Sequence, residues 1–201
     1  DFAGRISAEI RLPQALQAGL LTPFQYFCVT DNVDLSGDDL WNGNKYNLER
    51  LADKLCSKDR VRNIVDALRR YLANEFDCRA LCFCVTKEHA DFMAEQLRLY
   101  GFEACSLTSD TSNEARAQII KDFRDAKIHY LCVVDIFNEG VDIPEIDTVL
   151  FLRPTESLTI FLQQLGRGLR LCVGKTELTV LDFVAQANKK YDFTARFRAL
   201  S

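Results

Sequence analysis

After residue 79 the sequence alternates short apolar segments with amphipathic ones, a pattern that few folds accommodate. Runs rich in β-branched and aromatic residues predict strands at 80–85, 104–108, 128–134, 147–152 and 177–183. The spacing of apolar residues between these runs predicts helices at 87–101 and 112–126. Strands that alternate with helices of about 10–15 residues form parallel sheets with helices on both faces. We therefore predict an α/β fold with a mostly parallel sheet.

Two details support the predicted helices. Ala115, Ile119 and Phe123 are spaced four apart, which places them in one apolar stripe along the second helix. Gly101 follows the last periodic residue of the first helix, where glycine commonly ends a helix.

Residues 1–75 follow a different pattern. They predict a short helix, a break at Pro23 and a strand near 24–29. A polar loop rich in Asp, Asn and Gly follows over 31–47, and two helices then lie at about 47–56 and 58–76. We expect a lead-in segment over 1–75 and an α/β domain over 76–201, with one compact unit over 1–201 as the alternative.

Composition excludes several classes of protein. The chain has 48% hydrophobic and 27% charged residues, which are ordinary values for a globular domain. No apolar run reaches the roughly 18 residues that a membrane span needs, so we expect no membrane partner. The net charge of −4 argues mildly against a stand-alone nucleic-acid-binding protein, although a basic groove on an acidic domain stays open. The chain begins at Asp1 instead of Met, so we expect a piece of a longer protein.

The cysteines indicate a reduced core more than a metal site. Eight are present, none forms a C-x-x-C pair, and several lie in the apolar runs predicted as strands. Buried reduced thiols pack as small hydrophobic groups, so we expect no metal ligands among them. Thiols stay reduced in the cytoplasm, so we expect a cytoplasmic protein.

The stretch 163–176 contains two patterns associated with phosphate. Gly174, Lys175 and Thr176 match the end of an ATP-binding loop, G-x-x-x-x-G-K-[ST]. The preceding glycine of that loop is one position too far away, at Gly168. The loop should also run from a strand into a helix, whereas here a helix is predicted before it and a strand after it. This part is therefore predicted to be a turn.

The other pattern lies on a predicted helix, 156–170, capped by Thr155 after Pro154. Its apolar positions fall in a narrow arc that can pack against the sheet: Leu158, Leu162, Leu165 and Leu169. The opposite side carries Gln163, Arg167 and Arg170. Guanidinium groups match the geometry of phosphate oxygens and stay charged at any working pH, so this side predicts phosphate contact.

Four segments, in order across 80–183, resemble the motifs of the C-terminal motor domain of superfamily 2 helicases and translocases, the DEAD/DEAH type. The family's last motif, Q-x-x-G-R-x-x-R, is matched by Gln163, Gly166, Arg167 and Arg170. The preceding motif resembles "VVDIFNEGVDIPEIDTVLF", with Asp135, Gly140, Asp142 and Pro144 in matching order. The segments "ALCFCVTKEHADFMAEQL" and "SLTSDTSNEARAQIIKDF" resemble the two motifs that open the domain, with Arg116 at the arginine position. Residues 1–75 and the phrases "FNEGVDIP" and "LRPTES" resemble the bacterial branch of restriction-enzyme motor subunits.

The resemblance implies a RecA-like three-layer sandwich that faces a second, upstream RecA-like domain across a cleft. The upstream domain would bind most of ATP and Mg²⁺, because no phosphate loop and no D-E-x-[HD] motif occurs in these residues. Arg167 and Arg170 match the arginine fingers, and Gln163 would couple the cleft to the upstream domain. The resemblance also implies nucleotide contacts at Gly140, Asp142 and Gly166, with Asp142 on the ribose.

The resemblance further implies that loops at the strand ends bind the nucleic-acid backbone. The residues concerned are Thr86, Lys87, Thr108, Ser109, Arg116, Val134, Asp135 and Asn138. Val134 departs from the family, which usually has a threonine whose hydroxyl binds a phosphate at that position. The restriction-enzyme branch favours double-stranded DNA, with RNA as the alternative.

The predicted function is therefore the second motor domain of an ATP-dependent helicase or translocase, inactive in ATP hydrolysis by itself. The alternative is a non-catalytic α/β domain for interaction or regulation that has a degenerate motor fold. The intact set of Gln163, Arg167 and Arg170 favours the motor domain, because a purely structural domain does not require such a face.

Overall fold

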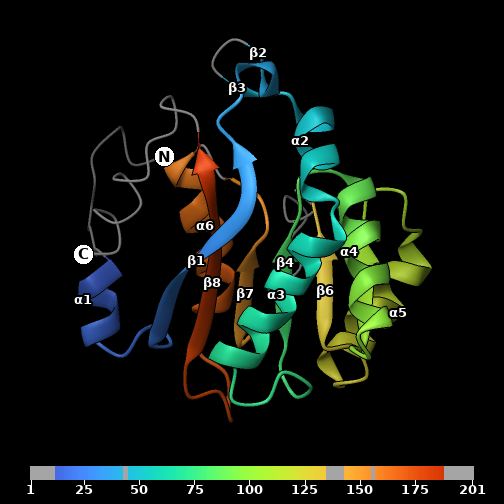
Figure 1. Ribbon diagram of the computed structural model, residues 1–201. Coiled ribbons are helices and arrows are strands. Elements are labelled where there is room, and N and C mark those ends of the chain that lie inside the picture. Colours follow the sequence, from blue (N-terminus) through green and yellow to red (C-terminus); the bar gives the residue numbers. More distant parts are fainter. Residues whose placement is uncertain (1–11, 43–44, 135–142, 155–156, 188–201) are drawn as a thin grey trace, which may run out of the picture.

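The computed structural model describes residues 12–42, 45–134, 143–154 and 157–187 of the chain (Figure 1). Its α-helices are α1 (Leu12–Gln17), α2 (Leu48–Leu55), α3 (Lys58–Tyr71), α4 (Lys87–Leu99), α5 (Asn113–Arg124) and α6 (Leu158–Gly168). The strands of its main sheet are β1 (Phe24–Leu35), β4 (Ala80–Phe83), β5 (Ala104–Leu107), β6 (Tyr130–Val133), β7 (Thr148–Phe151) and β8 (Leu178–Ala187). A short 3₁₀ helix (Asp38–Leu40) and a small hairpin of β2 (Trp41–Asn42) and β3 (Lys45–Tyr46) follow β1. None of the helices in these ranges is long and apolar enough to cross a membrane.

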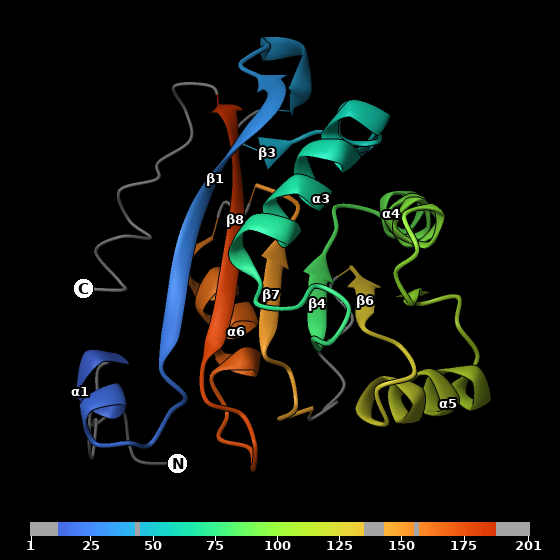
Figure 2. The same ribbon diagram turned by 60° about the horizontal axis from the view of Figure 1, so that its bottom comes forward.

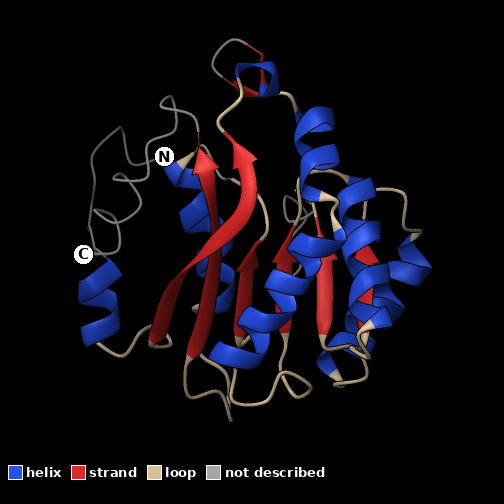
Figure 3. Cartoon of the chain, in the orientation of Figure 1, coloured by secondary structure: helices blue, strands red, loops and turns tan. Residues whose placement is uncertain are grey.

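The main sheet has six strands in the order β1-β8-β7-β4-β6-β5, and every neighbouring pair is parallel (Figure 3). The strands predicted after residue 79 are all present, each within a few residues of its expected bounds. The predicted α/β fold with a parallel sheet is confirmed.

Helices cover both faces of this sheet, as predicted (Figure 2). Alternate strand residues such as Ala80, Cys82 and Cys132 pack on one face with α3 and α4. The intervening residues, such as Leu81 and Val133, pack on the other face with α5 and α6. The central strands are therefore buried on both sides, which is why their sequences are continuously apolar.

The prediction that the cysteines pack in the core holds for four of the eight. Cys78, Cys82, Cys84 and Cys132 are buried free thiols, whereas Cys28 is exposed. Burial raises the pKa of the Cys78 thiol to about 12 and that of Cys84 well above its usual value. These thiols are therefore packing groups with little thiolate character.

The predicted polar loop over 31–47 is wrong in its first part. Strand β1 continues to Leu35, and Asp34 and Leu35 still pair with β8 after a register irregularity that follows Thr30. Leu35 is buried while Asn32 and Asp34 are exposed, which is the alternation of a half-buried strand. Pairing of Asp34 and Leu35 with the long strand β8 keeps the end of this polar sequence extended.

Helix α6 is shorter and rotated relative to the prediction. Its N-cap is Ser157, and Thr155 lies outside the described residues. Leu158 is 36% exposed, and Phe161 takes its place against the sheet, with its ring centroid 4.9 Å from that of Phe151. The stripe predicted for α5 is also only partly buried: Ala115 is exposed and Phe123 is fully buried.

The described part of the first 75 residues shares the sheet and the core with the rest. Strand β1 pairs with β8 along most of its length. The buried residues Val61, Ile64 and Val65 of α3 lie in the same cluster as the central strands. The boundary near residue 75 stays a prediction.

Candidate functional site

The arginine-bearing helix α6 is packed very closely on the sheet. A Cβ atom added at Gly168 would lie 2.6 Å from Cδ1 of Leu178 and 3.2 Å from Cγ2 of Val149. Any larger residue there would force the buried Leu178 side chain to move, so glycine favours the close approach of the helix to the sheet. At Gly166 an added Cβ meets no atom of the described residues within 4 Å, so the described domain gives no packing reason for that glycine.

The C-terminal end of α6 is held by two segments, the turn that follows the helix and the distant segment before β1. Nζ of Lys175 donates to the carbonyl oxygens of Gly168 (2.5 Å), Arg170 (2.9 Å) and Pro144 (3.2 Å). Thr22 donates from its backbone N–H to the Leu169 carbonyl and from its hydroxyl to the Arg170 carbonyl, both over 2.8 Å. These bonds satisfy carbonyls that a helix end leaves without partners.

Lys175 therefore has a structural role, and the ATP-loop interpretation of Gly174, Lys175 and Thr176 fails on geometry as well as on spacing. Gly174 has a φ of +85°, and Lys175 N–H donates to the Cys172 carbonyl, which closes a turn before β8. All three ammonium protons of Lys175 can be used by its carbonyl partners. Burial lowers the pKa of Lys175.

Lys175→Met is expected to destabilise the fold by about 1–3 kcal/mol, because it leaves partly buried carbonyl oxygens without a donor. Thr176→Ala is the matched control, since Thr176 is exposed and its loss should change stability by less than about 0.5 kcal/mol. Urea unfolding of both variants measures the difference. Equal stabilities for the two variants would contradict the proposed role of Lys175.

The predicted phosphate-binding residues come from the end of α6 and from the turn that follows it. Gln163 is exposed and Arg167 is partly buried, and both lie on the helix one turn apart. Burial lowers the pKa of Arg167 from its usual value. Arg170 is exposed and lies beyond the helix, so its position is set by the turn and by the bonds to its carbonyl from Thr22 and Lys175.

The loops after β4 and β5 are brought together although β6 separates the two strands. Nζ of Lys87 lies 2.6 Å from Oδ1 of Asp110, which joins the start of α4 to the loop after β5. The Thr86 hydroxyl accepts from His89 N–H (3.2 Å) and caps α4. Thr86 therefore has a local structural role as a helix cap. The side chains of Lys87 and Asp110 are exposed, so this ion pair lies on the surface.

The loop after β5 is itself stabilised by polar contacts. Thr108 is buried, and its backbone N–H donates to the Thr111 hydroxyl over 3.1 Å. Arg116 donates to the Thr108 carbonyl over 3.3 Å, while its Nε and Nη1 have no hydrogen-bond partner among the described residues. Ser109, between these anchors, is exposed.

The motif "VVDIFNEGVDIPEIDTVLF" is only partly described. Val134 is partly buried and packs against the core beside α3 and α4. Asp135, Asn138, Gly140 and Asp142 lie outside the described residues.

A buried polar cluster was not predicted from the sequence. Arg60 is only 1% exposed and lies in contact with Asp31, His89 and the carbonyl of Leu152. Arginine and aspartate are normally expected at the surface, and Asp31 fell within the predicted polar loop. A hint was present in the i, i+3, i+4 apolar positions Val61, Ile64 and Val65, because Arg60 lies at the edge of that stripe.

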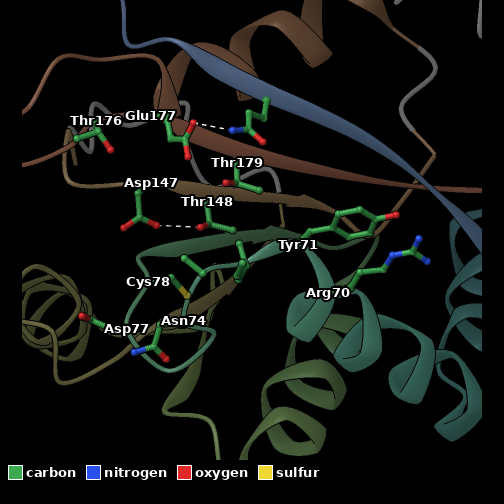
Figure 4. Close-up of a pocket in the computed structure, with 13 residues that line it drawn as sticks. Arg70, Tyr71, Asn74, Asp77, Cys78, Asp147, Thr148, Thr176, Glu177 and Thr179 are labelled. Carbon is green, nitrogen blue, oxygen red and sulfur yellow. Dashed lines mark hydrogen bonds between the residues drawn. The ribbon is translucent and has the colours of Figure 1, made fainter.

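A cavity of about 550 Å³ lies at the edge of the sheet where the strands begin, opposite the edge that carries the loops after β4 and β5 (Figure 4). Its acidic groups already have partners. Asp147 accepts from Arg79 N–H (2.9 Å) and from the Thr148 hydroxyl (2.8 Å), and Glu177 accepts from the Gln25 amide (2.8 Å). None of the predicted site residues lines this cavity.

Comparison with known proteins places the motifs in a family. Residues 63–172 match the family model described as the helicase conserved C-terminal domain. The chain is 35% identical over 108 residues to a candidate ATP-dependent helicase of Saccharomyces cerevisiae, IRC3, covering 54% of the chain and 16% of that protein. It is 34% identical over 137 residues to the type I restriction enzyme EcoKI endonuclease subunit of Escherichia coli, covering 61% of the chain and 12% of the subunit.

The fold is also found among solved structures. A fragment of a candidate HsdR subunit of a type I restriction enzyme from Vibrio vulnificus superposes with a TM-score of 0.69 at 23% identity, covering 90% of this chain and 35% of that one. The chain spans less than a fifth of the length of the yeast and Escherichia coli relatives. Because the family match extends over more than half of the chain and the sheet has the same fold, the chain belongs to the helicase conserved C-terminal domain family of superfamily 2.

Proposed function

We propose that this domain is the second half of an ATP-dependent nucleic-acid translocase and that it supplies Arg167 and Arg170 to ATP held by an upstream motor domain. The observation that carries the proposal is the rigid mounting of these arginines. Gly168 packs against Leu178, and Lys175 and Thr22 hold the carbonyls at the end of α6. Groups that stabilise developing charge are most effective when they are held in place before the reaction.

The residues of this domain fit a nucleotide partner. Gly166 lies between Gln163 and Arg167, and an added Cβ there would meet open space, so a phosphate group can approach the backbone closely. ATP supplies the phosphoryl group that is transferred, and Mg²⁺ would be held mainly by the upstream domain. Arg167 and Arg170 would bind the phosphate oxygens, and Gln163 would couple the nucleotide cleft to the upstream domain. Gly140 and Asp142 stay proposed nucleotide contacts.

The proposed contact with nucleic acid lies in the loops after β4 and β5. Lys87 and Ser109 are at the surface there, and the Lys87–Asp110 ion pair joins the two loops. Contact with the phosphate backbone is independent of base sequence, which suits a protein that moves along a strand. The remaining proposed contacts are Thr86, Thr108, Arg116, Val134, Asp135 and Asn138.

We take double-stranded DNA as the substrate because one relative is named as a subunit of a restriction endonuclease. Other relatives are named as RNA helicases, so RNA is the competing substrate. The two are distinguished by the test below.

ATP hydrolysis should be measured for the full-length protein that contains this domain, and for the 201-residue chain by itself. We expect hydrolysis by the full-length protein that duplex DNA stimulates and single-stranded RNA does not, and none by the chain alone. Stimulation by RNA only would replace the proposed substrate. No hydrolysis by the full-length protein under any condition would favour an interaction domain with a degenerate motor fold.

A further inference from the structure

Arg60 lies at the centre of a buried polar cluster that connects four separate parts of the chain. Its Nε lies 2.7 Å from Oδ2 of Asp31 in β1, and its Nη2 donates to the Leu152 carbonyl over 2.9 Å. Its Nη1 lies 3.4 Å from Nε2 of His89 in α4. The side chains of Arg60 and Asp31 are each 1% exposed. The guanidinium therefore acts as a fixed fork inside the protein.

His89 extends the cluster to the end of β4. The Val85 N–H donates to Nδ1 of His89 over 3.2 Å. Burial, together with the nearby Arg60 charge, lowers the pKa of His89 to about 3, so the ring is neutral at neutral pH. With Nδ1 as the acceptor, the single ring proton is on Nε2, and the contact between Nε2 and Arg60 is one of packing.

The two backbone groups at the ends of this cluster adjoin the two parts of the proposed site. Val85 directly precedes Thr86 and Lys87, the loop proposed to contact nucleic acid. Leu152 directly follows β7 and begins the connection to α6, which carries Arg167. Arg60 and Asp31 themselves come from the first 75 residues, outside the motif segments.

The cluster is poorly explained by stability alone. Replacing a buried ion pair by apolar residues of similar size is often neutral or stabilising. Oδ1 of Asp31 is buried and has no hydrogen-bond partner among the described residues, which adds a cost. A rigid charged fork does, however, fix the position of the Leu152 carbonyl that it binds and of the His89 ring that it contacts.

We propose that Arg60 is a positioning residue that holds the loop after β4 and the connection to α6 in one fixed relation. Contact of the loop after β4 with nucleic acid is thereby coupled to the position of Arg167 on α6. Arg60 touches neither substrate in this scheme and acts through the Leu152 carbonyl and through His89. The inference rests on the proposed function, because it assigns the two ends of the cluster to the two parts of that site.

The test uses Arg60→Lys in the full-length protein. Lysine keeps the positive charge and can still reach Asp31, but it cannot also bind the Leu152 carbonyl in a planar fork. We expect kcat for nucleic-acid-stimulated hydrolysis to fall by about 10–100-fold, the size of effect that a small misplacement of a catalytic group produces, with KM for ATP little changed. We also expect faster hydrogen exchange of the backbone amides that follow both β4 and β7.

Val65→Ala is the matched control, because Val65 is 1% exposed on the same helix and belongs to the hydrophobic core. It should destabilise the protein without lowering kcat. If Arg60→Lys lowers kcat no more than Val65→Ala does at equal thermal stability, the proposal is overturned. Faster exchange in only one of the two loops would overturn the coupling.

Two further variants separate the possible failures. If Arg60→Lys does not fold, Asp31→Asn removes the charge partner at nearly constant size and should change kcat in the same direction. If Arg167→Ala has no effect in the same assay, the proposed function fails. Hydrogen exchange in the two loops still decides whether Arg60 links them.

Discussion

Arg167→Ala is expected to lower kcat for nucleic-acid-stimulated ATP hydrolysis by the full-length protein by about 10³-fold or more, the effect of losing an arginine finger in comparable enzymes. The reason is that the guanidinium would stabilise charge that develops on the phosphate oxygens during transfer. An interaction realised only in the transition state affects kcat and leaves nucleotide binding largely intact. Steady-state hydrolysis and direct binding of an ATP analogue measure the two quantities.

Arg62→Ala is the matched control for this experiment. Arg62 is also on a helix, has a side chain that is 68% exposed and pairs with Asp59 one turn away, at 3.6 Å. Its removal changes the net charge equally and should leave kcat unchanged, since an exposed pair contributes little. Arg167→Lys should recover only part of the activity, because lysine keeps the charge but lacks the fork. Unchanged turnover in Arg167→Ala would remove the finger assignment and favour an interaction domain.

His89→Gln is expected to make the stability of the fold less sensitive to acid. The pKa of His89 is about 3 in the folded protein and 6.5 in the usual reference state, so the unfolded chain takes up a proton in this range while the folded protein does not. The histidine therefore contributes stability that is fully present above pH 6.5 and is lost progressively as the pH falls toward 3. The complete loss is on the order of 5 kcal/mol.

Urea unfolding from about pH 7.5, above this window, down to about pH 4, within it, measures the effect. As the pH falls, the free energy of unfolding of wild type should decrease, and the slope should include the uptake of about one proton by His89 in the unfolded chain. His89→Gln should lack this contribution to the slope. The chain has one other histidine, so His129→Gln is the control, and it should keep the slope that His89 causes. Identical slopes for wild type and His89→Gln would show that His89 has the same pKa in the folded protein as in the unfolded chain.

The order and type of the elements after residue 79 were predictable from the sequence. Continuous apolar runs such as 80–85 can be satisfied only by strands that are buried on both faces, and Gly101 ends α4 with a φ of +89°, as glycine does at a helix end. The ATP-loop interpretation of Lys175 could likewise be rejected from spacing alone. These features depend on local periodicity, which the sequence contains directly.

The buried side of α6 was predicted less well. The leucine spacing placed Leu158 in the core, but the structure buries Phe161 there because the rings of Phe151 and Tyr26 lie beneath it. A helix with apolar residues over a wide arc can pack in more than one rotation. The shape of the sheet below it, formed by strands distant in sequence, selects among them.

By itself the sequence determined the parallel α/β fold, the family motifs and the position of Arg167 on a helix. Only the tertiary structure decided which groups hold that helix and which charges are buried. Thr22 reaches the turn that follows α6 across 148 positions of sequence, and Arg60 meets Asp31 across 29 positions. Periodicity reports how a segment faces the core, whereas contacts between distant polar groups depend on how strands and helices are brought together. A buried arginine therefore has the same local pattern as an exposed one until its partners are in place.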